Sequence, residues 1–222
     1  MDRSDVAFWI TDEAQEWVEA AESDAGHPTD AVSASQVLSD DLMRWSRWWL
    51  GLGTFVVAFL AAGTAGSLGM ALLVDGPGDT GSVVTVVGVL VVAVVTLAIC
   101  AVVLWRLYRS GRRLARALRW WLAHRAGAVP SRGFAGWIAP RAALVNPVVS
   151  LRVLTATLSG LIGIFGLSMI GYSVTEEAVL LIASMLWGLL GTACCLGQFG
   201  GVMRLVSGLA DTDPLWGRIR GR

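Results

Sequence analysis

The side chains that most often carry out chemistry are scarce in this chain, which has two histidines and three cysteines among its 222 residues. His27 and His124 have no partner at metal-ligand spacing. Cys100, Cys194 and Cys195 lie in apolar stretches, where a thiol behaves as a small hydrophobe. Motifs for zinc proteolysis, a nucleophilic serine, a P-loop or dinucleotide binding do not occur. We therefore predict no catalytic residue, no cofactor and no metal site, and expect that the chain is not an enzyme.

Four long windows contain no charged side chain and no histidine. They cover Trp48 to Val74, Thr80 to Trp105, Val153 to Thr175 and Ala178 to Met203. About 20 apolar residues of helix cross a bilayer core, so each window is long enough to span one. Membrane enzymes and proton-coupled transporters place ionisable groups inside the bilayer, and these windows hold none. The sequence predicts an all-α integral membrane protein, a four-span transmembrane helix bundle with cytosolic amphipathic helices.

The charge pattern divides the chain into five segments. They are an acidic N-terminal segment (1–46), a first transmembrane hairpin (47–108), a basic amphipathic loop (109–146), a second hairpin (147–207) and a basic tail (208–222). Residues 1–41 carry eleven acids and one Arg, whereas residues 42–222 carry sixteen Arg, six acids and no Lys. Because basic residues stay on the cytoplasmic side, both termini and the central loop are predicted to be cytoplasmic. We expect a multi-pass protein of a bacterial plasma membrane.

The acidic segment contains one predicted helix that begins after Thr11 and has acids in its first turn. Its apolar residues Ala14, Trp17, Val18 and Ala21 recur at spacings of three and four, which favours docking on protein. A partly disordered acidic tail is the alternative. Residues 25–34 resemble a linker. Residues 33–36 match a capping box, which predicts a helix that continues into the first span.

A basic amphipathic helix is predicted after the second span. Arg109, Arg112, Arg116 and Arg119 fall within about 80° on a helical wheel. Leu114, Leu118, Trp121 and Leu122 lie on the opposite side. The arginines suit anionic lipid headgroups or an acidic partner surface, and an ordinary positive-inside extension would also carry them. We expect the acidic segment to dock on this arginine-bearing helix, and we assign Trp17 as a further lipid or partner contact.

Small residues at four-residue spacing mark the predicted contacts between spans. Such residues let helix backbones approach closely in a membrane. They are Ala58, Ala62 and Gly66 in the first span, Gly163 in the third, and Gly188, Gly197 and Gly201 in the fourth. The contacts are either within one chain or between subunits. Gln198 is the most polar side chain of a span and is expected to hydrogen-bond across helices for about 1 kcal/mol.

These features favour a non-catalytic polytopic membrane protein. It would act through protein contacts as a scaffold, assembly factor or accessory subunit of a membrane complex. Its expected partners are the lipid bilayer, with anionic lipids, and a protein partner or a second copy of itself, but no nucleic acid. The alternative is a small channel or permeation subunit formed by oligomerisation, with polar Thr, Ser and Gln198 faces lining a path.

Overall fold

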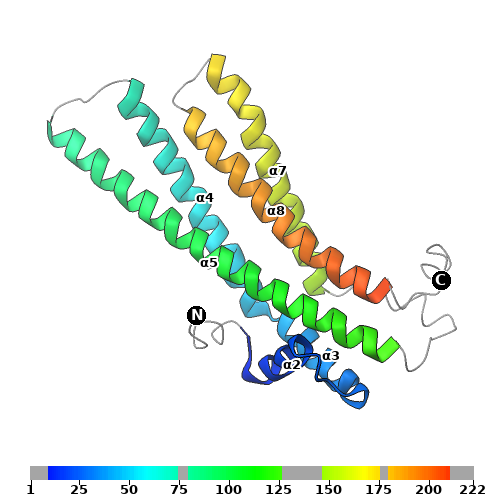
Figure 1. Cartoon of the computed structure of the whole chain (residues 1–222). Coiled ribbons are helices and arrows are strands. Elements are labelled where there is room, and N and C mark those ends of the chain that lie inside the picture. The colour runs from blue at the N-terminus through cyan, green and yellow to red at the C-terminus, as the bar shows by residue number, and fades with distance from the viewer. Residues whose placement is uncertain (1–9, 75–79, 127–146, 176–179, 211–222) are drawn as a thin grey trace. The chain divides into compact units, whose positions relative to one another are not determined.

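The computed structural model describes residues 10–74, 80–126, 147–175 and 180–210. Every regular element in these ranges is a helix (Figure 1). In chain order they are α2 (Asp12–Glu22), the 3-10 turn η1 (Pro28–Asp30), α3 (Ala31–Leu42), α4 (Trp45–Val74), α5 (Thr80–Ala126), α7 (Pro147–Thr175) and α8 (Leu181–Ala210). The helical prediction is confirmed for the part of the chain that the structure describes.

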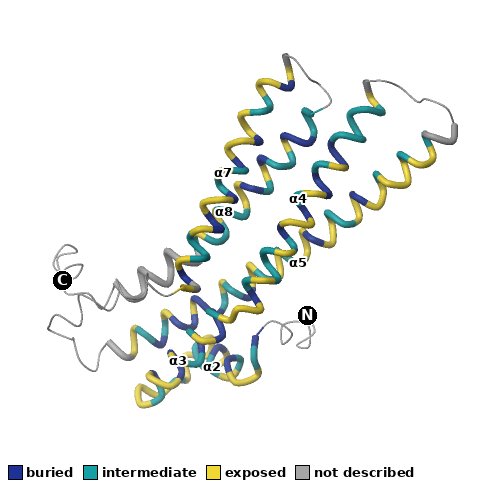
Figure 2. The backbone as a smooth tube through the Cα atoms, turned by 180° about the vertical axis from the view of Figure 1, so that it is seen from behind, coloured by how far each residue is buried: buried dark blue, intermediate teal, exposed yellow. Residues whose placement is uncertain are grey.

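Within the described residues, four helices are long and apolar enough to cross a membrane, as the charge-free windows predicted. They correspond to α4, α5, α7 and α8. Many of their large apolar side chains are exposed, and the exposed positions of α5 are visible in Figure 2. Val84 is 69 % exposed and Leu189 is 65 % exposed. Such exposure suits contact with lipid tails, so the chain has the architecture of a multi-pass membrane protein.

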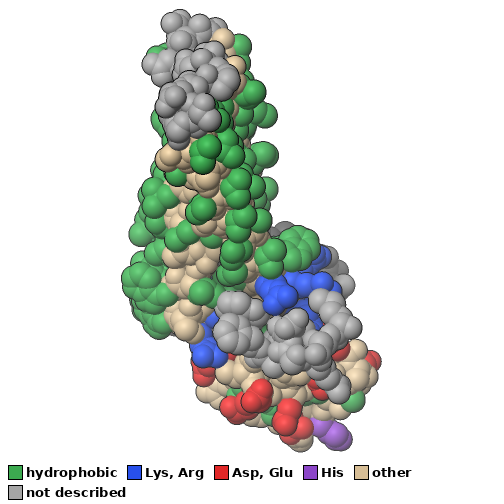
Figure 3. Space-filling model, turned by 90° about the vertical axis from the view of Figure 1, so that its left-hand side faces the viewer, with side chains coloured by type: hydrophobic (Ala, Val, Ile, Leu, Met, Phe, Trp, Pro, Cys, Tyr) green, Lys and Arg blue, Asp and Glu red, His purple; other side chains and the backbone are tan. Residues whose placement is uncertain are grey.

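The helices contribute to two compact units, and the boundary between the units falls inside α4, α5, α7 and α8. We call residues 1–49, 107–153 and 199–222 the polar unit, and residues 50–106 and 154–198 the apolar unit. The face drawn in Figure 3 carries mainly hydrophobic side chains on the apolar unit. Arginine and acidic side chains gather on the polar unit.

Two predictions about the end of the acidic segment are wrong. The helix α3 begins at Ala31 rather than at the capping box, because Pro28 starts a 3-10 turn that leads directly into it. The second half of the predicted linker is therefore helical. The helix also ends at Leu42 instead of continuing into the first span, and α4 begins separately at Trp45.

In the apolar unit, α4 packs on α8 through small residues and one tryptophan. A side-chain carbon added at Gly66 would lie 2.4 Å from the backbone of Ala183, so the two helices touch there. The indole of Trp187 stacks on Phe59 and donates a 3.0 Å hydrogen bond to the Phe59 carbonyl oxygen. This contact satisfies the indole N–H in apolar surroundings. Ala58 and Ala62 are fully buried on the same helix.

The helices α7 and α8 approach each other most closely at their glycines. A carbon added at Gly166 would lie 2.4 Å from the Gly188 nitrogen, and one at Gly191 would lie 2.4 Å from the Gly163 nitrogen. Backbone therefore contacts backbone, as it does where small residues drive helix association in lipid. Gly197 is half-buried on α8, while Gly201 lies outside the residues whose surroundings are described.

Two polar contacts join α7 and α8 as well. Thr155 donates a 2.6 Å hydrogen bond to the side-chain oxygen of Gln198, so the predicted cross-helix bond of Gln198 is present. The hydroxyls of Ser173 and Ser184 lie 3.4 Å apart and both side chains are fully buried. Each bond pairs a polar group that would otherwise face hydrocarbon.

The close approach at Gly166 generates a prediction about stability. Gly166→Ala should lower the free energy of unfolding by about 1–3 kcal/mol, because the new methyl group would force two backbones apart. Gly171→Ala on the same helix is the control, since nothing lies within 4 Å of a carbon added there. Helix propensity alone would make this control neutral or stabilising by up to about 1 kcal/mol. Thermal unfolding in mild detergent measures both, and equal effects would contradict the packing described here.

Candidate functional site: a charged interaction surface

The acidic segment docks on α5 through apolar side chains. In the polar unit, α2 and α3 lie against the C-terminal part of α5 (Figure 1). Their buried residues form one core, which contains Ile10, Ala14, Val18, Ala31, Ala34, Leu38, Leu42, Leu114, Ala117, Leu118 and Trp121. The apolar stripe of α2 therefore packs on the apolar stripe of α5, as both helical patterns favoured.

Trp121 is the largest fully buried side chain of this core. Its ring meets Trp17 edge to face at 5.5 Å between ring centroids, and its indole N–H donates a 3.0 Å hydrogen bond to the Trp17 carbonyl oxygen. Trp121 thus combines a large buried apolar area with an indole N–H whose hydrogen bond is made. It joins α2 to α5 across more than one hundred residues of sequence.

The turn after α2 closes over the same part of α5. Asp24 has a positive φ of 55° and ends the helix, and its carboxylate accepts a 2.9 Å hydrogen bond from the Trp120 indole. At Gly26 an added carbon would lie 2.4 Å from the ring of Trp121, so only a glycine lets this turn sit on the indoles. The turn and the two tryptophans are therefore fitted to each other.

One ion pair lies at the edge of the docked helix. Arg113 donates two hydrogen bonds to the Glu22 carboxylate, at 2.9 Å and 2.7 Å, in the bidentate geometry that guanidinium groups favour. This pairing lowers the pKa of Glu22 below its ordinary value and raises that of Arg113. The Glu22 side chain is 48 % exposed, so the pair contributes little to docking energy beside the buried tryptophans.

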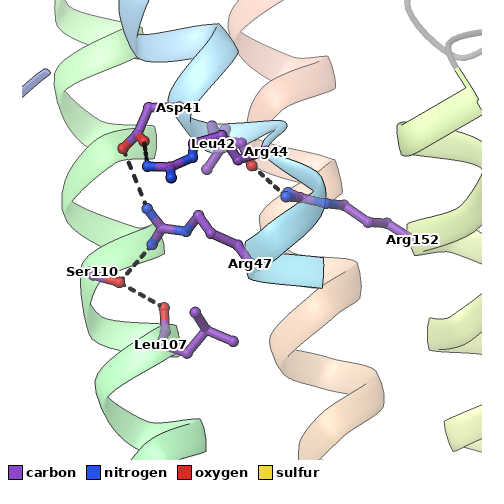
Figure 4. A network of polar contacts seen from close by, with 7 residues as sticks. All are labelled: Asp41, Leu42, Arg44, Arg47, Leu107, Ser110 and Arg152. Atoms are coloured by element: carbon purple, nitrogen blue, oxygen red, sulfur yellow. Dashed lines mark hydrogen bonds and ion pairs between the residues drawn. The ribbon is translucent and has the colours of Figure 1, made fainter. Parts of the chain in front are cut away.

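A second polar network joins the end of α3 to the start of α4 (Figure 4). The Asp41 side chain is only 2 % exposed and pairs with Arg44 at 3.3 Å and with Arg47 at 3.4 Å. Arg47 is also buried and donates a 2.6 Å hydrogen bond to the Ser110 hydroxyl on α5. Arg152 of α7 donates to the Leu42 carbonyl oxygen.

These arginines explain why the helix is interrupted between α3 and α4. The last turn of a helix leaves carbonyl groups without intrahelical partners and carries partial negative charge. At the end of α3 the Leu42 carbonyl accepts from Arg152, while Arg44 and Arg47 neutralise Asp41. Removing one partner of a buried pair costs about 3–5 kcal/mol, because the remaining charge stays buried. The network therefore fixes how α3, α4, α5 and α7 meet in the polar unit.

The four predicted arginines lie on the other side of α5. Arg109, Arg112, Arg116 and Arg119 are all exposed and are called here the arginine face. The docked helices cover the opposite stripe, which contains Leu114, Leu118 and Trp121. The acidic segment therefore docks on the predicted helix through apolar side chains, and Arg116 adds to the lowering of the Glu22 pKa. Trp17, predicted as a lipid or partner contact, is half-buried against Trp121.

Several residues of this site escaped the sequence reasoning. Arg113 is not among the four predicted arginines, although its wheel position between the arginine face and the apolar stripe is where an edge ion pair forms. The sequence pattern shows Asp41 only as one acid of the acidic N-terminal segment. Its three-residue spacing from Arg44 on a helix was the available signal. Its pairing with Arg47 required the helix break, which the sequence pattern did not predict.

The core around Trp121 generates a prediction about docking. Trp121→Ala should release α2 and α3 from α5, because removing a buried indole costs about 3–5 kcal/mol. Hydrogen exchange should then lose protection across residues 12–42. The matched control is Trp49→Ala, since Trp49 is 61 % exposed. Unchanged protection in Trp121→Ala would mean that another contact holds the acidic segment in place.

The described ranges also contain other side chains that could do chemistry. Cys100, Cys194 and Cys195 are free thiols. No group of three or more His, Cys, Asp or Glu residues there is placed to hold a metal ion. The charged surface of the polar unit is thus the best candidate for a functional site. No protein-family model, curated protein or solved structure matches this chain.

Proposed function

We propose that this chain is a non-catalytic membrane protein that acts through protein contacts, as a scaffold, assembly factor or accessory subunit of a membrane complex. The observation that carries the proposal is the exposed arginine face, which α2 and α3 leave uncovered while they pack on the opposite stripe of α5. One side of α5 packs on the shared core, and the other side exposes guanidinium groups. Such a helix is suited to bind an acidic surface.

Helix geometry favours a protein over lipid headgroups for the outer half of this face. The charge-free window of α5 ends at Trp105, and the helix continues without a break to Ala126. At about 1.5 Å per residue, Arg116 lies about 15 Å and Arg119 about 20 Å beyond Arg106 along the helix axis. The headgroup layer is only about 5–8 Å thick, and an ordinary tilt shortens these distances little. Headgroups suit Arg109, whereas a protein surface suits Arg116 and Arg119.

The proposal includes an orientation. The links between the paired spans carry acids and no basic residue, whereas every arginine lies at the other ends of the spans. By the positive-inside rule, the polar unit, both termini and the arginine face would lie in the cytoplasm. The membrane in this proposal is a bacterial plasma membrane. The partners would accordingly be cytoplasmic surfaces or cytoplasmic loops of other membrane proteins.

Thiol labelling tests this orientation. In a background without the three native cysteines, Gly78→Cys and Glu177→Cys should react with an impermeant thiol reagent added outside intact cells. Glu16→Cys in α2 should react only after the membrane is opened, since α2 belongs to the proposed cytoplasmic side. Glu16 is exposed, so a lack of reaction in intact cells would not reflect burial. Labelling of Glu16→Cys from outside would reverse the orientation.

The alternative is a permeation subunit formed by oligomerisation. Its support is the set of polar side chains in the spans, but several of the described hydroxyls there donate within their own helix. Thr64, Ser67, Thr96 and Ser168 each donate to a carbonyl oxygen four residues earlier in their own helix. The Gln198 oxygen accepts from Thr155. Groups already paired in this way line a water path poorly, so we rank permeation second.

Two measurements on the whole chain separate these functions. Extraction of native membranes in mild detergent should retain a stoichiometric protein partner, and R109Q/R112Q/R116Q/R119Q should lose it. The control E176Q/E177Q neutralises two charges outside the polar unit and should keep the partner. Equal retention by all three chains would contradict the assigned surface.

In liposomes the purified protein should show no ion flux, and a conductance that Gln198→Leu removes would favour the permeation function.

A further inference from the structure

The junction between α3 and α4 exposes one arginine and two tryptophans next to each other in the chain. The Arg44 side chain is 48 % exposed, Trp45 is 47 % exposed and Trp49 is 61 % exposed. We call these three residues the junction surface. It belongs to the polar unit and lies on a different helix from the arginine face. Two large indoles outside the core, beside a guanidinium group, suit a ligand that is both apolar and anionic.

The two exposed tryptophans are held in place by a third. Trp48 is half-buried, and its ring meets Trp45 edge to face at 5.8 Å between ring centroids. Its other contact is with Trp49, at 4.7 Å and again edge to face. Aromatic pairs favour this geometry. The exposed indoles are therefore braced by a half-buried one, which lowers the entropy that they lose when they bind a ligand.

Arg44 is held from the other side by the buried Asp41 (Figure 4). The Asp41 carboxylate pairs with Arg44 at 3.3 Å and with Arg47 at 3.4 Å, so one negative charge is shared between two guanidinium groups. Asp41 consequently compensates only part of the positive charge of Arg44. The Arg44 guanidinium is oriented by this contact, yet nearly half of the side chain stays exposed. A fixed and exposed guanidinium is suited to a phosphate group.

The position of the two tryptophans along α4 matches the edge of a bilayer. On a helical wheel Trp45 and Trp49 lie within about 60° of Val56 and Leu60. Val56 is 47 % exposed and Leu60 is 62 % exposed, so this is the side of the span that suits contact with lipid tails. Trp45 and Trp49 are about 6 Å apart along the helix axis, and the headgroup layer is about 5–8 Å thick. Tryptophan is enriched at that level of membrane proteins.

We propose that the junction surface binds the headgroup of an anionic phospholipid. The Arg44 guanidinium donates to the phosphate, while the indoles of Trp45 and Trp49 contact the glycerol and the first acyl carbons. A zwitterionic headgroup fits less well, because its ammonium group would approach Arg44. A lipid is favoured over a protein because the junction surface continues directly into the lipid-facing side of α4. The site requires only that α4 spans a membrane, so it does not depend on the proposed function or orientation.

Native mass spectrometry of the purified whole chain in mild detergent tests the site, with phosphatidylglycerol and phosphatidylcholine as probes. The wild type should bind phosphatidylglycerol about tenfold more tightly than Arg44→Gln, because a charge-assisted contact is lost. Arg44→Lys should recover only part of the difference, since an ammonium group cannot form the two-bond contact. W45L/W49L keeps apolar side chains but removes the indoles, and it should also weaken phosphatidylglycerol binding.

The matched control is Arg113→Gln, which removes one arginine from the same unit at a position paired with Glu22. It should bind phosphatidylglycerol as the wild type does. Hydrogen exchange across residues 31–42 must stay protected in Arg44→Gln, because Arg44 also pairs with Asp41. If that protection is lost, W45L/W49L decides, and unchanged phosphatidylglycerol binding by this variant would overturn the proposal.

Three other results would overturn it. The first is equal phosphatidylglycerol binding by the wild type and by an Arg44→Gln chain that keeps α3 protected. The second is displacement of phosphatidylglycerol by inorganic phosphate alone, which would show that the site takes a free anion. The third comes from native membranes, where a photoreactive residue in place of Trp45 should couple to phospholipid. Coupling to a protein instead would assign the junction surface to a protein contact.

Discussion

The burial of Trp121 beneath the acidic segment is the interaction on which the polar unit depends. Its indole contacts Trp17 and donates to the Trp17 carbonyl, and the turn at Gly26 closes over its ring. Buried aromatic area is worth more than an exposed ion pair, so apolar contact rather than charge decides which stripe of α5 receives α2. Most charged side chains of both helices consequently remain exposed, and Glu22 and Arg113 pair at the edge of the contact.

The buried Asp41 network serves a different purpose from the exposed charges. Arg47 is drawn out of water and Arg152 partly so, and full burial of an ion costs several kcal/mol unless partners replace the lost hydration. Here Asp41, Ser110 and the end of α3 supply those partners. The same residue type thus fixes the helix junction where it is buried and forms a contact surface where it is exposed.

The apolar unit follows a separate physical rule. Lipid tails are as apolar as leucine, so burial of apolar area gives little drive for helices to associate within a membrane. Close backbone contact at Gly66, Gly163 and Gly166 supplies dispersion energy instead. The indole of Trp187 and the amide of Gln198 add hydrogen bonds where water is absent. Large side chains are left on the outside, where lipid tails can contact them.

The sequence by itself determined the helical class and the four candidate spans, because the length of a charge-free window is a one-dimensional property. It also indicated the two stripes of α5 and the apolar stripe of α2, since helical periodicity fixes which residues share a face. The tertiary structure alone decided how these faces combine. Whether Arg113 or Arg116 meets Glu22 depends on the rotation of α2 on α5, which the tryptophans set. The break at Leu42 likewise depends on Arg152, which comes from a distant part of the chain.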